Sequence, residues 1–259
     1  MSPIETMQKT ELAPGELAIC WLGQAGFLMK DHLGHTLILD PYLTNVGYHM
    51  RGFKRLSPMM VDPEEVKVDY YLVSHQHFDH FDYEAIPVIA KNAPETRFFG
   101  PDCCLAEMKK LNVDTSRYTL LNRGDVFDDG IVHIEATTAD HGDMAPDAVG
   151  FLLEMGGHRM YFGGDTCFHE ELCEKAAAFH PDVSVLSING RFGNMNAQEG
   201  VRAAELIGAK YSIPCHFWTF VEHGGEPDLF FAGLKDSDVT ALPFWQGEVQ
   251  VLDAANNIR

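Results

Sequence analysis

Apolar residues in this chain fall in short runs that polar, glycine-containing or proline-containing turns bring to an end. Runs of this length, rich in Val, Ile, Leu and aromatic residues, are typical of β-strands. The first three, at residues 17–22, 27–30 and 36–39, follow one another closely. They predict an antiparallel meander, because tight turns join strands that pair side by side. Residues 68–73 predict a further strand that is buried.

Farther along the chain, strands alternate with short helices. Strands are predicted at residues 97–99, 118–121, 132–137, 149–155, 159–162, 183–188, 211–214 and 248–252. Helices are predicted at residues 83–92, 102–111 with Asp102 as N-cap, 169–179, 196–206 with Asn196 as N-cap, and 226–235. No linker divides these elements, so we expect a loose arm at residues 1–16 and a single domain at residues 17–259. Two sheets packed face to face, with helices outside, would bury such strands.

Residues 44–66 show no periodic pattern and predict a long loop. Its aromatic and basic side chains stand out in an acidic chain: Tyr48, His49, Arg51, Lys54 and Arg55. Long loops in compact domains are often functional, so one interpretation is a lid or a substrate-binding loop. A solvated crossover or a contact between subunits is the alternative.

Composition and charge narrow the possible partners. Hydrophobic residues make up 46% and charged residues 22% of the 259 residues, an ordinary balance for a soluble globular protein. The formal charge of −19 argues against a non-specific surface for nucleic acid or anionic membrane. No apolar run has the length of a transmembrane helix and no secretory signal is visible, so a cytoplasmic protein is expected. The six cysteines show no paired framework and are expected to be reduced thiols.

The densest group of metal-ligating residues is the segment 74–80, Ser-His-Gln-His-Phe-Asp-His, directly after the predicted buried strand. Alternate residues of an extended chain point the same way, so His75, His77 and Asp79 can converge. Neutral imidazoles and a carboxylate held together suit a divalent transition metal. His80 is offset from the other three, which leaves room for a second ion beside the first.

Three later segments offer further ligands where a predicted strand ends, at His141, Asp165 and His216. Each residue alone has an ordinary explanation as a turn or loop residue. The same placement, repeated in four segments, favours a shared site at one edge of the sheets. Asp40 also ends a strand, and it could accept a hydrogen bond from a ligand histidine or cap its own turn. His133 lies within an alternating strand and is expected on its solvent face.

The motif His75-x-His77-x-Asp79-His80, followed by His141, by Gly163-Gly164-Asp165-Thr166 and by His216, resembles the metallo-β-lactamase superfamily. The resemblance covers residues 17 to about 252. It implies an α+β fold, a four-layer αββα sandwich, with a two-metal site at one edge. Within the superfamily, residues 21–27, 213–216 and 244–247 are most similar to L-ascorbate-6-phosphate lactonases.

The resemblance also implies a ligand set for two divalent ions. One ion would be held by His75, His77 and His141. The other would be held by Asp79, His80 and His216, with Asp165 bridging both. Around His141 the chain follows the wider superfamily, so Asp140 or Asp143 is an alternative ligand. Because none of these ligands is a thiolate, their softness does not choose between Zn and Mn.

These ligands imply a dinuclear metal-dependent hydrolase in which a water bridging the ions attacks as hydroxide. Asp79 would orient that water and pass a proton to the leaving group. The expected substrate is the lactone of a phosphorylated or acidic sugar, a small anionic molecule. Candidate substrate contacts are Arg191, Asn189, Tyr42 and His223.

Two other functions stay open on the sequence alone. The same activated water could attack phosphorus in a small phosphate ester, which would make the protein a phosphodiesterase. A non-hydrolytic di-iron redox or sensor protein is the second alternative. Assembly into a homo-oligomer is possible.

Overall fold

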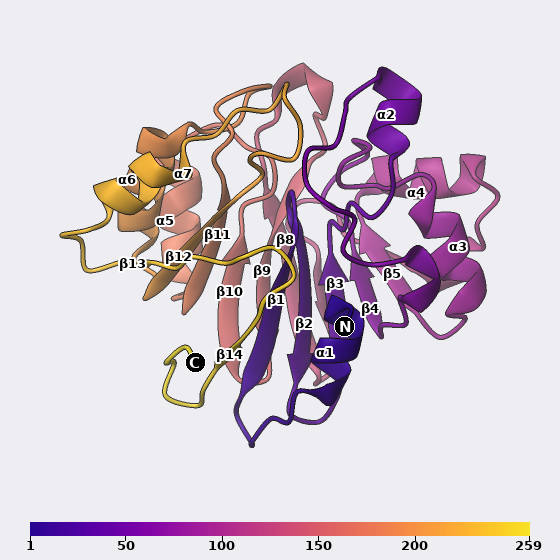
Figure 1. Ribbon diagram of the computed structural model, residues 1–259, viewed down its shortest axis with the longest axis horizontal. Coiled ribbons are helices and arrows are strands. Elements are labelled where there is room, and N and C mark those ends of the chain that lie inside the picture. Colours follow the sequence, from indigo (N-terminus) through magenta and orange to yellow (C-terminus); the bar gives the residue numbers. More distant parts are fainter.

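Two mixed β-sheets of seven strands each form the centre of the molecule, whose computed structural model describes residues 1–259 (Figure 1). In spatial order, the first sheet contains β14 (Val249–Leu252), β1 (Leu17–Gly23), β2 (Gly26–Asp31), β3 (Thr36–Leu39), β4 (Tyr70–Leu72), β5 (Arg97–Gly100) and β6 (Tyr118–Leu120). The second contains β13 (Thr240–Ala241), β12 (Tyr211–Cys215), β11 (Val183–Ser187), β10 (His158–Phe162), β9 (Val149–Met155), β8 (Val132–Thr138) and β7 (Val126–Asp128). The last strand, β14, returns from the end of the chain to pair antiparallel with β1.

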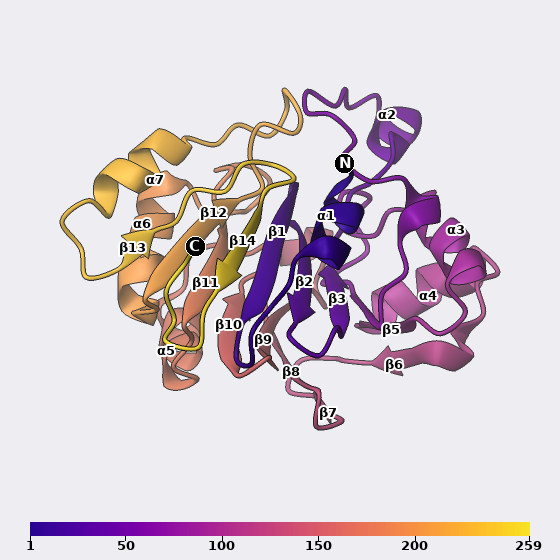
Figure 2. The same ribbon diagram turned by 60° about the horizontal axis from the view of Figure 1, so that its bottom comes forward.

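Helices cover the outer face of each sheet, and this gives the four layers of an αββα sandwich (Figure 1, Figure 2). Beside the first sheet lie α1 (Pro3–Lys9), α3 (Ala85–Asn92) and α4 (Asp102–Lys110). Beside the second lie α5 (Glu170–Ala178), α6 (Ala197–Ile207) and α7 (Pro227–Gly233). The remaining helical turns are α2 (Val46–Arg51) and the 3₁₀ segments Pro63–Glu65, Thr115–Arg117 and Gly142–Met144. None of these helices combines the length and the apolar character that crossing a membrane requires.

Strand β1 shows how the layers are held together. Leu17, Ile19 and Trp21 belong to a core cluster of 42 buried residues that joins the two sheets. The intervening Ala18 and Cys20 belong to a second cluster of 21 buried residues, between the first sheet and its helices. Because successive strand residues point to opposite faces, β1 is buried on both, which accounts for its continuous apolar run.

The structure differs from the predicted elements mainly near the N-terminus. The arm expected at residues 1–16 contains α1, which buries Ile4 and Met7. The signal for this helix lies in the sequence, because Ser2 and Glu5 have the spacing of a capping box and form one. Asp102 lies inside α4 and does not cap it. The loop expected at 44–66 contains α2, and the short strands β7 and β13 have no predicted counterpart.

Parallel pairing brings the candidate ligands to one edge. In the first sheet β3, β4 and β5 pair in parallel, and in the second β10, β11 and β12 do so. Asp40 and the segment 74–80 follow strand ends of the first sheet, and Asp165, Asn189 and His216 follow strand ends of the second. Since the carboxyl ends of parallel strands open onto the same edge, residues far apart in the sequence meet there.

Asp82 ties the chain after β3 to the start of α3. Its carboxylate is buried and accepts hydrogen bonds from the N–H groups of Leu43, Thr44 and Ala85 at 2.8–3.0 Å. We expect Asp82→Ala to lower the free energy of unfolding by about 2–3 kcal/mol, because these N–H groups lose their acceptor. Chemical denaturation measures this loss. The control is Asp62→Ala, which removes the exposed N-cap of the 3₁₀ segment Pro63–Glu65. An equal loss of unfolding free energy in both variants would contradict the role given to Asp82.

Candidate metal centre

Seven side chains from four segments meet at this edge of the sandwich. The potential ligand atoms of His75, His77 and His141 lie within 4.8 Å of one another. His75 Nε2 is 2.9 Å from His77 Nδ1, which is 3.3 Å from His141 Nε2. Three imidazole nitrogens thus lie close together, as the resemblance implies for one half of the site. Asp79, expected to converge with His75 and His77 along an extended segment, is grouped with His80 and His216 instead.

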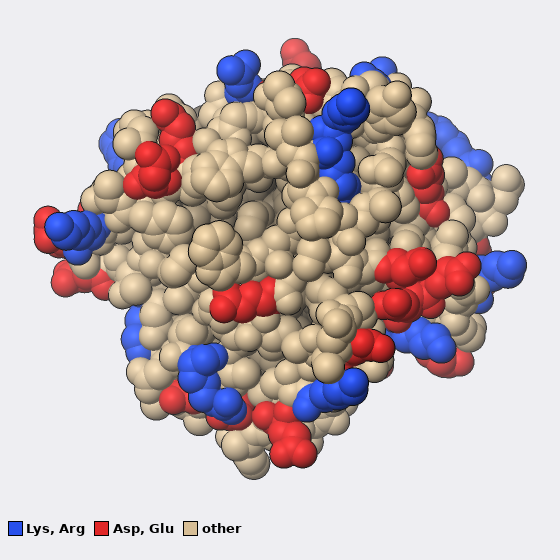
Figure 3. All heavy atoms as spheres, viewed as in Figure 1, with Lys and Arg blue, Asp and Glu red and all other residues tan.

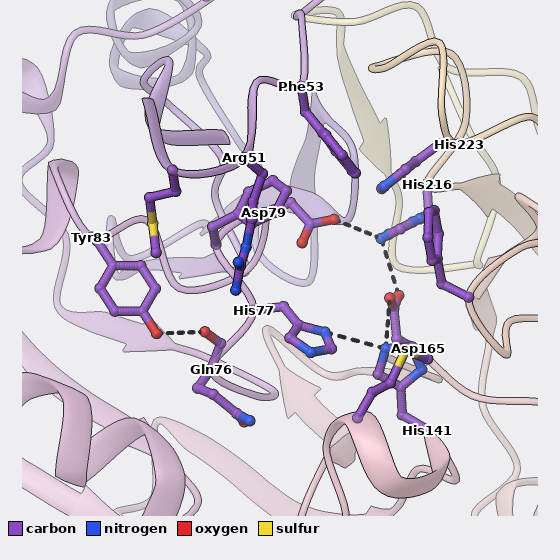
Figure 4. A pocket seen from close by; sticks show the side chains of 14 residues that line it. Arg51, Phe53, Gln76, His77, Asp79, Tyr83, His141, Asp165, His216 and His223 are labelled. Carbon is purple, nitrogen blue, oxygen red and sulfur yellow. Dashed lines mark hydrogen bonds and ion pairs between the residues drawn. The ribbon is translucent and has the colours of Figure 1, made fainter. Parts of the chain in front are cut away.

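The other half brings together Asp79, His80 and His216, whose ligand atoms also lie within 4.8 Å of one another. His216 Nε2 is 3.1 Å from His80 Nε2 and 3.2 Å from Asp79 Oδ2. Asp165 lies between the halves: Oδ1 is 3.2 Å from His216 Nε2, and Oδ2 is 3.7 Å from His141 Nε2 (Figure 4). One carboxylate therefore reaches both groups of imidazoles.

The donor chemistry of this cluster fits divalent cations. His80 Nδ1 donates a hydrogen bond to Asp40 at 2.7 Å, which in neutral His80 leaves the lone pair of Nε2 facing His216 Nε2. Asp165 Oδ1 is buried, with the Nε2 atoms of His216 and His80 at 3.2 and 3.4 Å. Buried carboxylates and imidazole lone pairs that face one another are costly to leave without a cation or a proton among them. These residues could hold metal ions.

Charges within the cluster set its protonation. Burial lowers the pKa of His75, His77 and His141, which keeps these imidazoles neutral, the form that binds metal. Burial acts in the same direction on His216, but the carboxylates of Asp165 and Asp79 outweigh it and raise the pKa of His216 to about 9. The half of the site with the carboxylates therefore holds positive charge more readily.

The pKa values of the carboxylates of Asp165 and Asp79 are lowered, whereas the pKa of His216 is raised. Burial would raise the pKa of Asp165, but His216 and His80 hold it well below its usual range. The imidazoles of His80 and His216 likewise depress the pKa of Asp79 against its burial. Both carboxylates are ionised, the state in which they bind metal.

Asp40 anchors the segment 74–80 through two hydrogen bonds. Its Oδ2 accepts the hydrogen bond from His80 Nδ1, and its Oδ1 accepts one from the N–H of Ser74 at 2.7 Å. Of the two roles that the sequence leaves open for Asp40, the structure shows the hydrogen bond to a histidine of the cluster, His80. This contact fixes the ring orientation and the tautomer of His80.

Gln24 is a site residue that the sequence reasoning missed. It lies in the turn between β1 and β2 and is fully buried, with Nε2 2.7 Å from Asp79 Oδ2 and 2.9 Å from His223 Nδ1. The amide has two protons and a third neighbour, His216 Nε2, at 3.0 Å. Where His223 accepts one of these protons at Nδ1, its neutral ring carries its own proton on Nε2. The backbone oxygen of Gln24 also accepts the N–H of His216 at 2.9 Å. The only sequence signal was a polar residue between glycines in an otherwise apolar hairpin.

Gln24→Asn tests whether this amide positions Asp79 and His223. Asparagine tolerates the positive φ of 51° at this position but is one methylene too short for both contacts. We expect metal affinity or kcat to fall about 10–100-fold, as is usual when a hydrogen-bond partner of a ligand is lost. Metal competition and steady-state kinetics measure the two effects separately. Unchanged affinity and kcat in a folded variant would mean that Gln24 only fills space.

A cavity of about 420 Å³ opens above the cluster. Its walls include Arg51 and Phe53 from the loop at 44–66, and Phe192 and His223 from the second half of the chain. Figure 4 shows Arg51 and His77 among the side chains that line this space. In Figure 3 much of the middle of this face carries no charged side chain. Arg51 is the one Lys or Arg side chain in the cavity wall.

The four predicted substrate contacts are placed differently. His223 lines the cavity and stacks on His216, with ring centroids 4.9 Å apart. Asn189 is buried and accepts a hydrogen bond from Asn194. The hydroxyl of Tyr42 accepts from the N–H of Gly47, and Arg55 lies over its ring. The cavity wall does not include Tyr42, Asn189 or the exposed Arg191.

Two other expectations about polar residues can be compared with the structure. His133 is half-buried on β8 and is not part of the cluster; it pairs with Asp128 at 3.1 Å, as a residue on the solvent face would. The carboxylate of Asp140 contacts His169 instead of the cluster, and His141 lies with His75 and His77. All six cysteines are free thiols.

The profile of the Beta-lactamase superfamily domain matches residues 18–216 of this chain. The chain therefore belongs to the metallo-β-lactamase superfamily. It is 30% identical over 233 residues to a UPF0173 metal-dependent hydrolase of Archaeoglobus fulgidus, covering 85% of this chain and 91% of that protein. A second UPF0173 metal-dependent hydrolase, from Thermoplasma acidophilum, is 30% identical over 226 residues, 83% of this chain and 90% of that protein. Within the superfamily, the chain belongs to the UPF0173 family.

Solved structures share the fold at lower identity. Igni18, a metallo hydrolase from Ignicoccus hospitalis, has a TM-score of 0.72 and 18% identity, covering 92% of this chain and 99% of that one. Isothiocyanate hydrolase from Delia radicum gut bacteria has a TM-score of 0.69 and 18% identity, covering 90% and 97%. CmlA, a diiron β-hydroxylase from Streptomyces venezuelae, has a TM-score of 0.68 and 14% identity, covering 94% of this chain and 55% of that one. These likenesses establish the αββα fold.

Proposed function

We propose that this protein is a dinuclear metal-dependent hydrolase that opens the lactone of a small anionic sugar derivative. The observation that carries the proposal is the position of Asp165, whose two carboxylate oxygens face the two halves of the cluster. Family membership supports metal-dependent hydrolysis, and the neutral and acidic N/O donors suit Zn or Mn. The lactone is chosen because segments around Gln24 and His216 resemble the ascorbate-phosphate lactonases.

Bound divalent ions would supply Lewis acidity and lower the pKa of a water toward neutrality. His75, His77 and His141 would hold one ion, and Asp79, His80 and His216 the other, with Asp165 shared. Asp79 is ionised and faces the cavity, so it can accept a proton at the start of the reaction and return it to the leaving oxygen. His223 presents a neutral ring to the same space, because burial and the neighbouring His216 lower its pKa to about 4.

Arg51 supports the choice of an anionic substrate. It is the cation on the cavity wall, whereas the predicted Arg191 lies outside it. A guanidinium binds carboxylate or phosphate through two parallel hydrogen bonds. A sugar lactone carrying such a group can place its ester over the metal ligands and its anionic group at Arg51. The loop at 44–66 then acts as a substrate loop.

The test is ring opening of a panel of phosphorylated and acidic sugar lactones by protein reconstituted with Zn or Mn. Turnover is expected to require His77, so His77→Ala should show none above background. Arg51→Ala should raise KM for the anionic lactones about tenfold or more, in line with the loss of a charge-assisted contact. The matched Arg191→Ala variant should keep the KM of the parent protein. An unchanged KM in Arg51→Ala together with a raised KM in Arg191→Ala would move the anion site to Arg191.

A phosphodiesterase is the second candidate, and the same observations favour it. The N/O donor set and Arg51 suit a phosphoryl group as well as a carboxylate ester. Hydrolysis of bis-p-nitrophenyl phosphate without activity on any lactone would establish this reaction instead. Two irons per chain with a visible absorption band would establish a di-iron redox or sensor protein instead. The likeness to CmlA shows only that the fold is shared.

A further inference from the structure

A second group of metal-ligating side chains lies outside the main cluster. Asp140 Oδ2 is 2.7 Å from His169 Nε2, and Cys167 Sγ is 3.2 Å from the same nitrogen. The three ligand atoms lie within 4.8 Å of one another. They come from two loops, one that ends β8 and one that leads into α5. This group has a thiol, which the main cluster lacks.

Protons can join the three side chains in pairs. His169 Nε2 carries at most one proton, which it can donate to the carboxylate of Asp140 or to the sulfur of Cys167, and the thiol of Cys167 can donate to Asp140. A cation in the middle would be bound by all three atoms at once. Thiolate, imidazole and carboxylate together form a borderline-soft set, which is typical of Zn²⁺.

The spacing is close to what a tetrahedral ion needs. With zinc bonds of about 2.0 Å to nitrogen and oxygen and about 2.3 Å to sulfur, ligand atoms stand about 3.3–3.6 Å apart. The His169 contacts to Asp140 and Cys167, at 2.7 and 3.2 Å, would widen by about half an ångström or less. His169 and Asp140 are 47% and 45% exposed, so their side chains are free to make this adjustment.

An ion also has access to the group and space for a further ligand. Asp140 and His169 line a second cavity of about 440 Å³, separate from the one above the main cluster. Glu171 and Arg123 lie on the same wall. A water or the Glu171 carboxylate can complete four-coordination from this side.

Backbone hydrogen bonds already join the two loops that carry Asp140 and Cys167, and a bound ion would stabilise this contact. The N–H of Cys167 donates to the carbonyl of Asp140 at 2.9 Å, and the N–H of Asp140 donates to Thr166 Oγ1 at 2.9 Å. Asp140 immediately precedes His141, and Cys167 follows Asp165 by two residues. An ion here would clamp the two loops that deliver His141 and Asp165 to the main cluster.

We propose that Asp140, Cys167 and His169 form a peripheral site for a borderline-soft divalent cation of the Zn²⁺ class. Cys167 binds as the thiolate and its proton passes to solvent. The ion acts as a structural clamp for the loops that carry His141 and Asp165. This site is independent of which substrate the main cluster hydrolyses.

Cobalt(II) titration of the whole protein tests the proposal, because thiolate ligation gives a charge-transfer band in the near ultraviolet that nitrogen and oxygen ligands do not. We expect the band to grow to one equivalent and to be absent in Cys167→Ser and strongly weakened in His169→Ala. The control Cys103→Ser, which changes another half-buried thiol, should keep it. His77→Ala should also keep the band while losing hydrolysis, which separates this site from the proposed function.

Two results would overturn the proposal. One is the absence of a thiolate band at saturating cobalt in the parent protein. The other is a band that survives unchanged in Cys167→Ser. Circular dichroism shows whether each variant is folded. If Cys167→Ser is not folded, the His169→Ala variant decides between the proposal and its rejection by losing or keeping the band. His169 suits this purpose because it is exposed and precedes α5.

Discussion

Asp165→Ala is expected to reduce hydrolysis at least about 10³-fold and to lower the metal content of the protein. Asp165 is the only carboxylate that faces both halves of the cluster, with contacts to His216 and to His141. Removing it leaves two groups of buried imidazoles without their shared counter-charge. A bound metal contributes several kcal/mol to transition-state stabilisation, and each 1.4 kcal/mol is worth about tenfold in rate.

The matched control for this variant is Asp143→Ala. Asp143 is exposed, lies two residues after His141, and was an alternative ligand on the sequence alone. We expect Asp143→Ala to keep the metal content and the activity of the parent protein. If Asp165→Ala retained both metal and activity, while Asp143→Ala lost them, the ligand set would be wrong.

Asp79→Asn is expected to lower kcat about 10²–10⁴-fold, the range of a lost general acid–base group. Asparagine keeps the size of the side chain and can still accept the hydrogen bond from Gln24, but it cannot take up a proton. It also offers a neutral oxygen where His216 and His80 now face a carboxylate. Steady-state kinetics give kcat, and metal analysis of the same sample gives the occupancy.

The two roles of Asp79 are separated by combining these measurements. Full occupancy with low kcat would assign the loss to proton transfer, and low occupancy that excess metal restores together with kcat would assign it to ligation. Full occupancy with kcat unchanged would contradict the proposed role. A Gln24→Asn protein should show a smaller loss, because it keeps the carboxylate and changes only its position.

Much of the site follows from the sequence because its ligands are short-range patterns at strand ends. His75, His77, Asp79 and His80 fall within six residues after a buried strand, so their clustering is a local prediction. The expected extended segment was wrong, because the N–H groups of His80 and Phe81 turn back onto the carbonyl of His77. This turn places Asp79 with His80 and His216. The convergence of His141, Asp165 and His216 is long-range, and it is predicted only by assuming that strand ends share an edge. Parallel pairing of β3 to β5 and of β10 to β12 is the physical basis of that assumption.

Gln24 and Arg51 were not predicted as site residues, because their positions depend on how loops pack against one another. Gln24 sits in an ordinary-looking turn, and only the packing of that turn against the His216 loop brings its amide to Asp79. Arg191 follows a strand end as predicted but lies outside the cavity, whereas Arg51 reaches in from the long loop.

The most direct test of the central claim is the metal content of the Cys167→Ser protein, in which the peripheral thiol cannot contribute. If the cluster around Asp165 is a dinuclear centre, this protein reconstituted with Zn or Mn should hold two equivalents per chain. Adding Asp165→Ala should bring the content well below two. One equivalent or none in the first protein, or a content that Asp165→Ala leaves unchanged, would contradict the account.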